Sequence, residues 1–360
     1  MTSADVVVVG AGAMGSAAAW CLAREGREVI VLERFEQGHV RGSSHGPSRI
    51  FRLAYPDPFY VALAQRALPL WRELEDEAGT PLLATTGGVD HGPTASVGSV
   101  AEALGAKGAA HEMLGPEAAR ERWSGMRFGE AVLFQPDAGR ANADATVRSL
   151  QERVAAHGAE LHFEEGVTVL EPGGTGVRVR TEADSYQAPV AVVACGPWAA
   201  SVLVGLMALP PLAVTREQVF YFSPTSDASW PSFIHHRQPF CYGLETPGRG
   251  VKVAEHHTGA PTDPDRRSFE VDDAGRERVA RYVETWFPGL EPESTGAETC
   301  LYTTTPTEDF VVDRVGPLVI ATGFSGHGFK FTPLIGRLLA DMAQGRPGPD
   351  RFRLPSMPSA

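Results

Sequence analysis

Three glycines near the start of the chain have the spacing that a phosphate-binding turn requires. Gly10, Gly12 and Gly15 form a G-x-G-x-x-G pattern directly after the apolar run 6–9. In such a turn the first glycine allows a tight bend, the second lets the backbone approach a pyrophosphate, and the third lets the helix pack closely on the strand. The N-terminus of the following helix then presents free N–H groups and partial positive charge. The pattern therefore predicts a dinucleotide site rather than a glycine-rich turn without a ligand.

An acidic residue stands where such a site needs one. Glu33 follows a second apolar strand, Val29–Leu32, and lies 21 residues beyond Gly12 (33 minus 12). A carboxylate at this position can accept hydrogen bonds from ribose hydroxyls. Its negative charge would repel a 2′-phosphate, so the sequence favours FAD or NAD over NADP.

The cysteines and the paired histidines show no metal-binding spacing. No C-x-x-C motif occurs, which is typical of proteins in a reducing compartment. His235 and His236 have no convincing metal partner, so we expect a pair in a loop and no metal site. Three of the four cysteines are expected to serve packing: Cys21, Cys195 and Cys241.

Composition and charge restrict the partners. The 360 residues carry a net charge of −12, which argues against nucleic acid and anionic membranes as partners, although a local basic pocket stays possible. The sequence contains no run of 18 apolar residues, so no membrane-spanning helix is predicted. The first strand begins within five residues of the N-terminus, so we expect no signal peptide and a cytoplasmic protein.

Both helices and strands are predicted to position these residues. The spacing of apolar residues predicts helices over 59–79, 96–105, 143–157, 272–287 and 333–344. Apolar runs predict strands over 161–163, 167–170, 176–181, 189–196, 214–223, 250–256 and 318–323. Two segments lack a regular pattern: a polar loop over 35–55, long enough to be functional, and turns near 124–142.

This order of elements predicts an α/β protein with two interleaved domains. A Rossmann-like FAD-binding domain would combine 1–81, 141–214 and 300–360. A substrate domain with a mainly antiparallel sheet would combine 82–140 and 215–299. Ligands of such proteins bind in the crevice between the domains and at the carboxyl ends of the strands.

Three further segments resemble a known family. They are the loop Gly42–Tyr55 (GSSHGPSRIFRLAY), the run Thr299–Thr303 (TCLYT) and the turn Gly323–Lys330 (GFSGHGFK). Together with the glycine turn, they are similar to the monomeric sarcosine oxidase family, which includes N-methyltryptophan oxidase and pipecolate oxidase. This family belongs to the FAD-dependent amine oxidases related to D-amino-acid oxidase, and the resemblance extends from Val6 to about residue 345.

The resemblance implies a reaction and a covalent cofactor. It implies that FAD is bound, that a C–N bond is oxidised to an imine, and that oxygen takes the electrons and becomes hydrogen peroxide. Cys300 matches the family cysteine that forms a thioether with the 8α-methyl group of the flavin. That step needs a thiolate, which a polar or electropositive setting favours.

Four residues match catalytic positions of the family. Lys252 matches the lysine that faces the flavin through water, where a fixed cation would stabilise reduced oxygen species. His45 and Arg49 match loop residues that raise the positive potential at the flavin. His256 matches a histidine near the substrate amine, where it would favour the neutral amine.

Four residues match substrate-binding positions. Arg52 and Lys330 match the pair that holds the substrate carboxylate, a planar fork and a point charge. Tyr302 and, less directly, Tyr242 match residues beside the substrate. The expected partners are thus a small amine with a carboxylate and molecular oxygen, and the family favours a monomer.

The remaining matches concern the cofactor. Ser44 departs from the sarcosine oxidases, which have histidine there, and agrees with members similar to pipecolate oxidase, so the substrate prediction moves away from sarcosine itself. The resemblance assigns cofactor contacts to Gly10, Gly12, Met14, Gly15, Glu33, Arg34, Ser43, Ser44, Val167, Cys300, Gly326, Gly328, Phe329 and Lys330.

Several functions stay open at this point. The leading hypothesis is an oxidase of N-methyl amino acids or of cyclic imino acids such as pipecolate or proline. A biosynthetic oxidase of an unusual or carrier-linked amine would use the same chemistry. Lys252 and Cys300 argue against a non-catalytic electron-relay flavoprotein, and a nicotinamide dehydrogenase has no use for Cys300.

Overall fold

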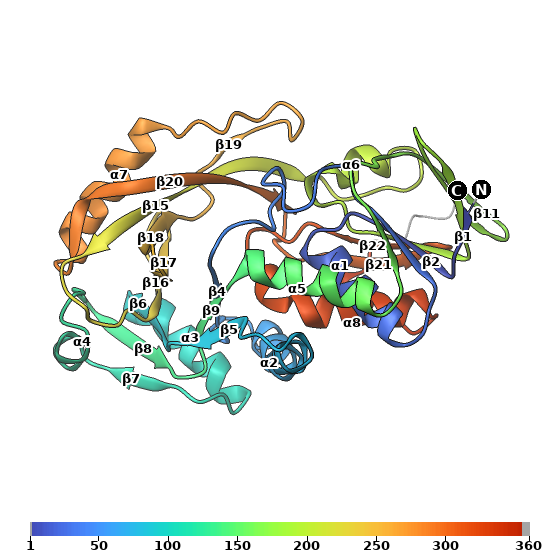
Figure 1. Ribbon diagram of the computed structural model, residues 1–360. Coiled ribbons are helices and arrows are strands. Elements are labelled where there is room, and N and C mark those ends of the chain that lie inside the picture. Colours follow the sequence, from blue (N-terminus) through green and yellow to red (C-terminus); the bar gives the residue numbers. More distant parts are fainter. Residues whose placement is uncertain (1, 355–360) are drawn as a thin grey trace.

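A six-stranded, mostly parallel sheet forms the centre of one half of the molecule (Figure 1). The computed structural model describes residues 2–354. Neighbouring strands are parallel except for the last pair, which is antiparallel. In spatial order the strands are β10 (Glu160–His162), β3 (Val29–Leu32), β2 (Val6–Val9), β14 (Val190–Val193), β22 (Leu318–Thr322) and β21 (Val311–Val315).

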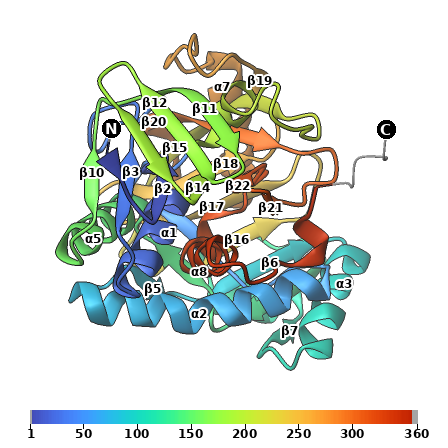
Figure 2. The same cartoon turned by 90° about the vertical axis from the view of Figure 1, so that its right-hand side faces the viewer.

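Alternate residues of the central strand β2 enter two different cores, because successive strand side chains point to opposite faces. Val6 and Val8 pack in the core that contains the helices, whereas Val7 and Val9 pack in the core that contains a four-stranded sheet over the other face (Figure 2). The helices are α1 (Ala13–Arg24), α2 (Pro58–Ala78), α3 (Thr94–Ala106), α5 (Ala143–Ala156) and α8 (Thr332–Ala343). The covering strands are β1 (Thr2–Ser3), β13 (Ser185–Ala188), β12 (Gly176–Thr181) and β11 (Val167–Gly173).

A nine-stranded, mainly antiparallel sheet forms the other half. Helix α7 (Asp273–Trp286) packs on it through Val279, Tyr282 and Val283. Long strand β20 (Leu290–Thr304) pairs with β15 (Ala213–Pro224). The strands that follow β15 across the sheet are, in order, β18 (Gly250–Glu255), β17 (Cys241–Thr246), β16 (Ser232–His235), β6 (Gly88–Gly92), β8 (Ala131–Gln135) and β7 (Glu112–Leu114). The short strand β19 (Ala260–Pro261) pairs with the start of β15 on the same edge as β18, opposite β20.

The predicted α/β class is confirmed, and most predicted elements are present. Strand β14 lies beside β2, as a strand that returns to the nucleotide-binding sheet should. Helix α2 ends at Gly79 in the left-handed conformation. Among the described residues, no helix has the length and apolar character that crossing a membrane requires.

Three predictions about irregular segments were wrong. Residues 124–142 contain two strands, β8 and β9 (Gly139–Ala141), and the expected loop 35–55 contains β4 (Arg49–Phe51). β9 pairs with β4 and with β5 (Leu83–Thr85) because Gly139 allows a close approach: a Cβ there would lie 2.0 Å from the carbonyl oxygen of Ala84. His235 ends strand β16 instead of lying in a loop. Each of these strands depends on a partner distant in the sequence, so local patterns did not predict it.

Candidate active site

One cavity of about 1880 Å³ is lined by residues of both large sheets. It extends from the glycine turn after β2 to the strands β17 and β18. Its volume exceeds the roughly 300–1,000 Å³ of a typical small-molecule pocket, which leaves room for a dinucleotide and a small substrate together. Every site residue predicted from the sequence lines this cavity except Gly15.

The glycine turn has the close contacts that its spacing predicts. Gly10 has φ +98°, and a Cβ on it would lie 2.7 Å from the carbonyl oxygen of Ala194. A Cβ on Gly15 would lie 1.8 Å from the carbonyl oxygen of Gly10, so Gly15 serves the packing of helix on strand and does not reach the cavity. Gly12 is the N-cap of α1 and has no side chain to cover the helix N-terminus. The cradle therefore fits a phosphate group.

Glu33 is fixed at the end of β3 beside this turn. Its carboxylate accepts hydrogen bonds from the N–H groups of Ala11 (2.8 Å) and Phe35 (3.1 Å). Burial opposes ionisation, but hydrogen bonds from His39, Ala11 and Phe35 lower the pKa of Glu33 below its ordinary value. Its neighbour Arg34 forms an exposed ion pair of 2.7 Å with Asp265. The acid is thus anionic and rigid where a ribose is expected.

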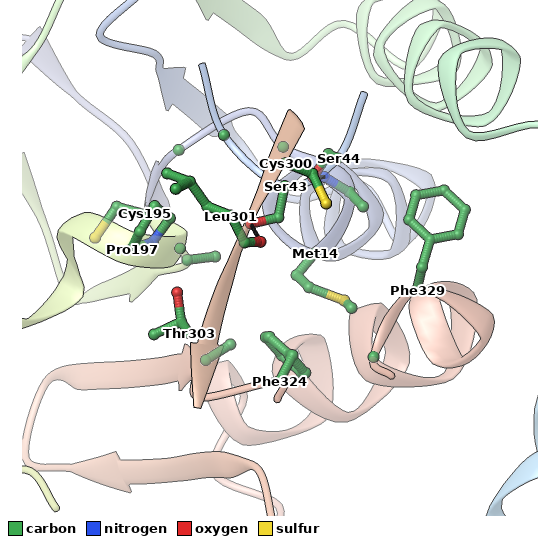
Figure 3. A pocket seen from close by; sticks show the side chains of 18 of the residues that line it. Met14, Ser43, Ser44, Cys195, Pro197, Cys300, Leu301, Thr303, Phe324 and Phe329 are labelled. Carbon is green, nitrogen blue, oxygen red and sulfur yellow. Dashed lines mark hydrogen bonds between the residues drawn. The ribbon is translucent and has the colours of Figure 1, made fainter. Parts of the chain in front are cut away.

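The loop between β3 and β4 folds around the guanidinium of Arg49. This side chain donates to the carbonyl oxygens of Ser48 (2.9 Å), Ser43 (3.2 Å) and His45. The hydroxyl of Ser44 accepts a hydrogen bond from the N–H of Ala13 at 3.0 Å, at the start of α1. The loop thereby closes over the glycine turn, so Ser43, Ser44, His45 and Arg49 all face one cavity (Figure 3 shows the two serines).

His45 presents an unsatisfied polar atom inside the cavity wall. Its Nε2 is buried and has no hydrogen-bond partner among the described residues. Burial, and then the charge of Arg49, lower the pKa of His45 to about 3, so the imidazole is neutral at pH 7. Buried polar atoms without partners are rare in native proteins, and a bound group that satisfies this nitrogen fits the cavity.

Cys300 lies on β20 in the wall of the cavity, beside Ser43 and Ser44 (Figure 3). It is a free cysteine. Burial raises the pKa of its thiol, while the charges of Arg49, Lys252 and Arg267 lower it. The predicted electropositive setting is therefore present, but desolvation outweighs it in this structure.

Lys252 lies on β18 with only 3% of its surface exposed. Its ammonium group donates a hydrogen bond to the carbonyl oxygen of Ser48 in the folded loop. Burial, and then repulsion by Arg49, lower the pKa of Lys252 to about 7. A buried lysine near its titration point can change charge within the physiological range.

His256, Tyr302 and Tyr242 form a chain of polar contacts. The Nδ1 of His256 lies 3.3 Å from the hydroxyl of Tyr302, which lies 3.5 Å from the hydroxyl of Tyr242. Burial, and then His257, Arg52 and Lys330, lower the pKa of His256 to about 3. The neutral imidazole can accept a hydrogen bond from an amine, but it is too weak a base to hold a proton at pH 7.

Arg52 and Lys330 meet beside the ring of Tyr55. The guanidinium carbon of Arg52 lies 4.3 Å from the ring centre and the ammonium of Lys330 lies 5.4 Å from it. Lys330 is 6% exposed, donates to the carbonyl oxygen of His327 at 2.6 Å, and has no carboxylate partner within residues 2–354. Burial, and then Arg52, lower the pKa of Lys330 well below its ordinary value. A buried lysine without an acidic partner beside an arginine favours an anionic ligand here, because a bound carboxylate would stabilise the charged form of Lys330.

Sequence reasoning missed four residues around these cations. Tyr55 and His327 line the cavity and lie within the segments that carry the family resemblance, so their position could have suggested them. Asp90 lies 3.7 Å from Arg52, and His236 lies 2.8 Å from Asp90. Neither has a local motif, because their contact depends on the pairing of β6 with β16. Within the described part of the chain, no group of three or more histidine, cysteine or acidic residues could hold a metal ion.

Comparisons with known proteins agree with this geometry. The profile of the FAD dependent oxidoreductase family, DAO, matches residues 5–342. A monomeric sarcosine oxidase of Streptomyces avermitilis is 35% identical over 362 residues, covering 94% of this chain and 93% of that protein. The human peroxisomal sarcosine oxidase is 34% identical over 364 residues, with coverages of 94% and 92%. Among solved structures, NikD in its Tyr258Phe form, an unusual amino acid oxidase essential for nikkomycin biosynthesis, has a TM-score of 0.89 at 28% identity, covering 98% of this chain and 97% of NikD.

Proposed function

The chain belongs to the FAD-dependent oxidoreductase family, and we propose that it oxidises secondary amines that carry a carboxylate. The substrates are N-methyl amino acids or cyclic amino acids, and the products are an imine and hydrogen peroxide. The sarcosine oxidases that are similar to this chain over almost its whole length support this reaction class.

One observation carries the proposal: the paired cations at the Tyr55 end of the cavity. Lys330 is buried without an acidic partner in the described chain, and Arg52 lies against the same ring. Keeping an unpaired cation in a desolvated site costs free energy, which a substrate carboxylate would recover on binding. Arg52 supplies a planar fork and Lys330 a point charge, so together they would orient a small carboxylate.

The other end of the cavity suits FAD. The glycine turn and the start of α1 would hold the pyrophosphate, and Glu33 the ribose. Further cofactor contacts are proposed for Met14, Arg34, Ser43, Ser44, Val167, Gly326, Gly328 and Phe329. Cys300 would bind the flavin covalently, supported by its place in the cavity wall near Arg49 and Lys252. When bound, FAD accepts two electrons from the carbon next to the amine nitrogen and passes them to molecular oxygen.

The amine end of the substrate would meet His256 and Tyr302. Oxidation requires the neutral amine, because its nitrogen lone pair stabilises the developing imine. Neutral His256 can accept a hydrogen bond from the amine N–H, and the cations Arg52 and Lys330 nearby disfavour an ammonium group. His256 therefore positions the amine, while the proton is lost to solvent before the amine reacts.

Lys252 would act in the oxygen half of the reaction. Its buried ammonium group can stabilise the negative charge that develops as oxygen is reduced, because the desolvated site strengthens this interaction. Arg49 and His45 line the same part of the cavity, and the guanidinium of Arg49 adds positive potential there.

The proposed domain division follows the sheets. The six-stranded sheet is built from segments within 1–81, 141–214 and 300–360, and the nine-stranded sheet is built largely from 82–140 and 215–299. Strand β20 crosses the boundary at residue 300, which brings Cys300 from the second sheet toward the cofactor end of the cavity.

The test is hydrogen peroxide release by purified yellow protein offered sarcosine, other N-methyl amino acids, L- and D-pipecolate, and proline. A substrate that bleaches the flavin without oxygen and yields one peroxide per turnover with oxygen would support the proposal. Flavin reduction without peroxide would exclude an oxidase and favour a dehydrogenase with another acceptor.

A second candidate is supported by the similarity to NikD. In this second candidate function, the chain is a biosynthetic oxidase that performs the same chemistry on an unusual or carrier-linked amine. No reduction of the flavin by any member of the panel, with flavin still bound, would favour this candidate. Titration with amines attached to a carrier protein would then be the decisive experiment.

A further inference from the structure

The guanidinium of Arg52 is held in the cavity by contacts of one nitrogen, Nη1, and by the packing of one of its faces. Its Nη1 donates a hydrogen bond to the carbonyl oxygen of Ala54 and lies 3.7 Å from Oδ1 of Asp90. The guanidinium lies over the ring of Tyr55. Within residues 2–354, neither Nε nor Nη2 of Arg52 donates a hydrogen bond to the protein. The edge formed by these two nitrogens is therefore available for a carboxylate, which accepts two parallel hydrogen bonds from arginine.

Asp90 is buried behind this arginine. It is 2% exposed, lies in the middle of β6 and is not part of the cavity wall. An isolated carboxylate in such a place is costly unless it is paired. The carboxylate of Asp90 has two partners, Arg52 and His236. The Nε2 of His236 lies 2.8 Å from Oδ1 of Asp90, the same oxygen that faces Arg52. The carboxylate thus joins a cavity cation to a histidine.

The two strands fix this arrangement. Strand β6 pairs in parallel with β16, and His236 directly follows β16. The backbone N–H of His236 donates to the carbonyl oxygen of His91 at 2.8 Å, which holds His236 beside Asp90. The next residue on β6, His91, packs instead with Phe128 and Trp286 of the second core. Alternation along the strand therefore separates Asp90, near the site, from His91, in the core.

We propose that Asp90, held by His236, is a positioning residue that orients Arg52 for carboxylate binding, an inference that rests on the proposed function. Asp90 cannot touch the substrate from behind the cavity wall, so it acts through Arg52. Without it, the long arginine side chain gains rotamers in a large cavity and must lose that freedom again when a carboxylate binds. The negative charge of Asp90 also balances the positive charge of Arg52. The single carboxylate of a substrate then has to balance only the charge of Lys330.

The experiment measures acetate binding to the holoenzyme by perturbation of the flavin absorbance. Acetate is the probe because it contains the carboxylate and nothing else of the substrate. We expect Asp90→Ala to raise the acetate Kd by about tenfold, the scale on which groups that orient a ligand act. Asp90→Asn should raise it by about threefold, because the amide keeps the shape and one acceptor oxygen. With the best amine substrate, KM should rise in parallel while kcat changes less than twofold.

Two further variants make the result decisive. Arg52→Gln tests the carboxylate site itself, and His91→Phe changes the adjacent residue on β6 without touching Arg52. We expect Arg52→Gln to weaken acetate binding at least tenfold and His91→Phe to leave it unchanged. If Arg52→Gln weakens binding but both Asp90 variants bind acetate as the wild type does, or more tightly, the positioning role is overturned and the proposed function stands. If Arg52→Gln has no effect, the proposed carboxylate site is wrong. Should Asp90→Ala not retain flavin, Asp90→Asn decides alone.

Discussion

The hydroxyl of Ser43 donates a 2.7 Å hydrogen bond to the carbonyl oxygen of Leu301, which joins the loop after β3 to strand β20 (Figure 3). These residues are 258 positions apart in the sequence. The bond places the loop that covers the glycine turn directly beside Cys300. The cofactor end of the cavity is therefore assembled from two distant segments, and the chemistry at Cys300 depends on that assembly.

The first prediction concerns this cysteine. Cys300→Ser should still bind FAD, because the glycine turn and Glu33 are unchanged, but the flavin should be released by acid. Wild-type protein precipitated with acid should stay yellow, and the Cys300→Ser pellet should be colourless. Cys195→Ser is the matched control, because Cys195 lines the same cavity near the glycine turn. A colourless wild-type pellet would show that the linkage does not form.

The second prediction concerns Lys252. Replacement by methionine keeps the length of the side chain and removes the buried charge. We expect the reoxidation of reduced flavin by oxygen to slow by about a hundredfold or more, as the loss of a preorganised charge does in other sites. Flavin reduction by substrate should change far less. Stopped-flow measurement of the two half-reactions separates these effects, and equal slowing of both would contradict the role.

The third prediction follows from the charge of the same lysine. Because burial and Arg49 lower the pKa of Lys252 to about 7, the cationic fraction falls as pH rises through neutrality. The rate constant of reoxidation should therefore decline with a midpoint near pH 7. The decline should be absent in Lys252→Met. A wild-type rate that is flat between pH 6 and 9 would indicate that bound flavin keeps Lys252 charged throughout this range.

Local patterns in the sequence predicted the elements that hold the cofactor. The order β2, turn, α1, β3 is encoded by neighbouring residues, namely a four-residue apolar run, three glycines and a second apolar run, so it needs no distant partner. The amphipathic helices α5 and α7 were likewise predicted within two residues of their ends from the spacing of their apolar residues. In the structure each begins after a side-chain cap, Asn142 or Asp272.

Strands that depend on distant partners could not be predicted in this way. Strand β9 has only three residues, one of them glycine, and exists because β4 and β5 flank it. The contact of Asp90 with His236 joins residues 146 positions apart. No periodicity in either segment carries that information, since it arises from the parallel pairing of β6 with β16. Apart from the glycine turn and Glu33, the predicted cavity residues rested on family resemblance, and Asp90 behind the cavity wall could be found only from the structure.

The fourth prediction tests the glycine turn. Gly10→Ala should abolish tight FAD binding, because the residue has φ +98° and the new Cβ would lie 2.7 Å from the backbone oxygen of Ala194. Gly26→Ala is the matched control, with φ +80° and no atom within 4 Å of its Cβ. It should carry a similar backbone strain of about 1–3 kcal/mol but keep its flavin. Equal flavin content in both variants would show that this turn does not determine binding.

The last prediction concerns stability at acidic pH. His91 is fully buried, stacks on His235 with ring centres 4.0 Å apart, and has no hydrogen-bond partner for either ring nitrogen among the described residues. Burial, and then His235 and His236, lower its pKa well below 6.5. Below about pH 6.5 the unfolded chain therefore binds a proton that the folded chain excludes, so the free energy of unfolding falls as pH falls.

The loss from His91 alone can reach about 1.4 kcal/mol per pH unit. His91→Phe keeps an aromatic ring of similar size and removes both nitrogens. The thermal unfolding midpoint of this variant should decline less steeply than that of the wild type between pH 6.5 and 5. Part of the slope should persist, because burial also lowers the pKa values of His45, His235, His256 and His327. Parallel curves for the two proteins would contradict the contribution assigned to His91, because an imidazole in the unfolded chain takes up its proton near pH 6.5.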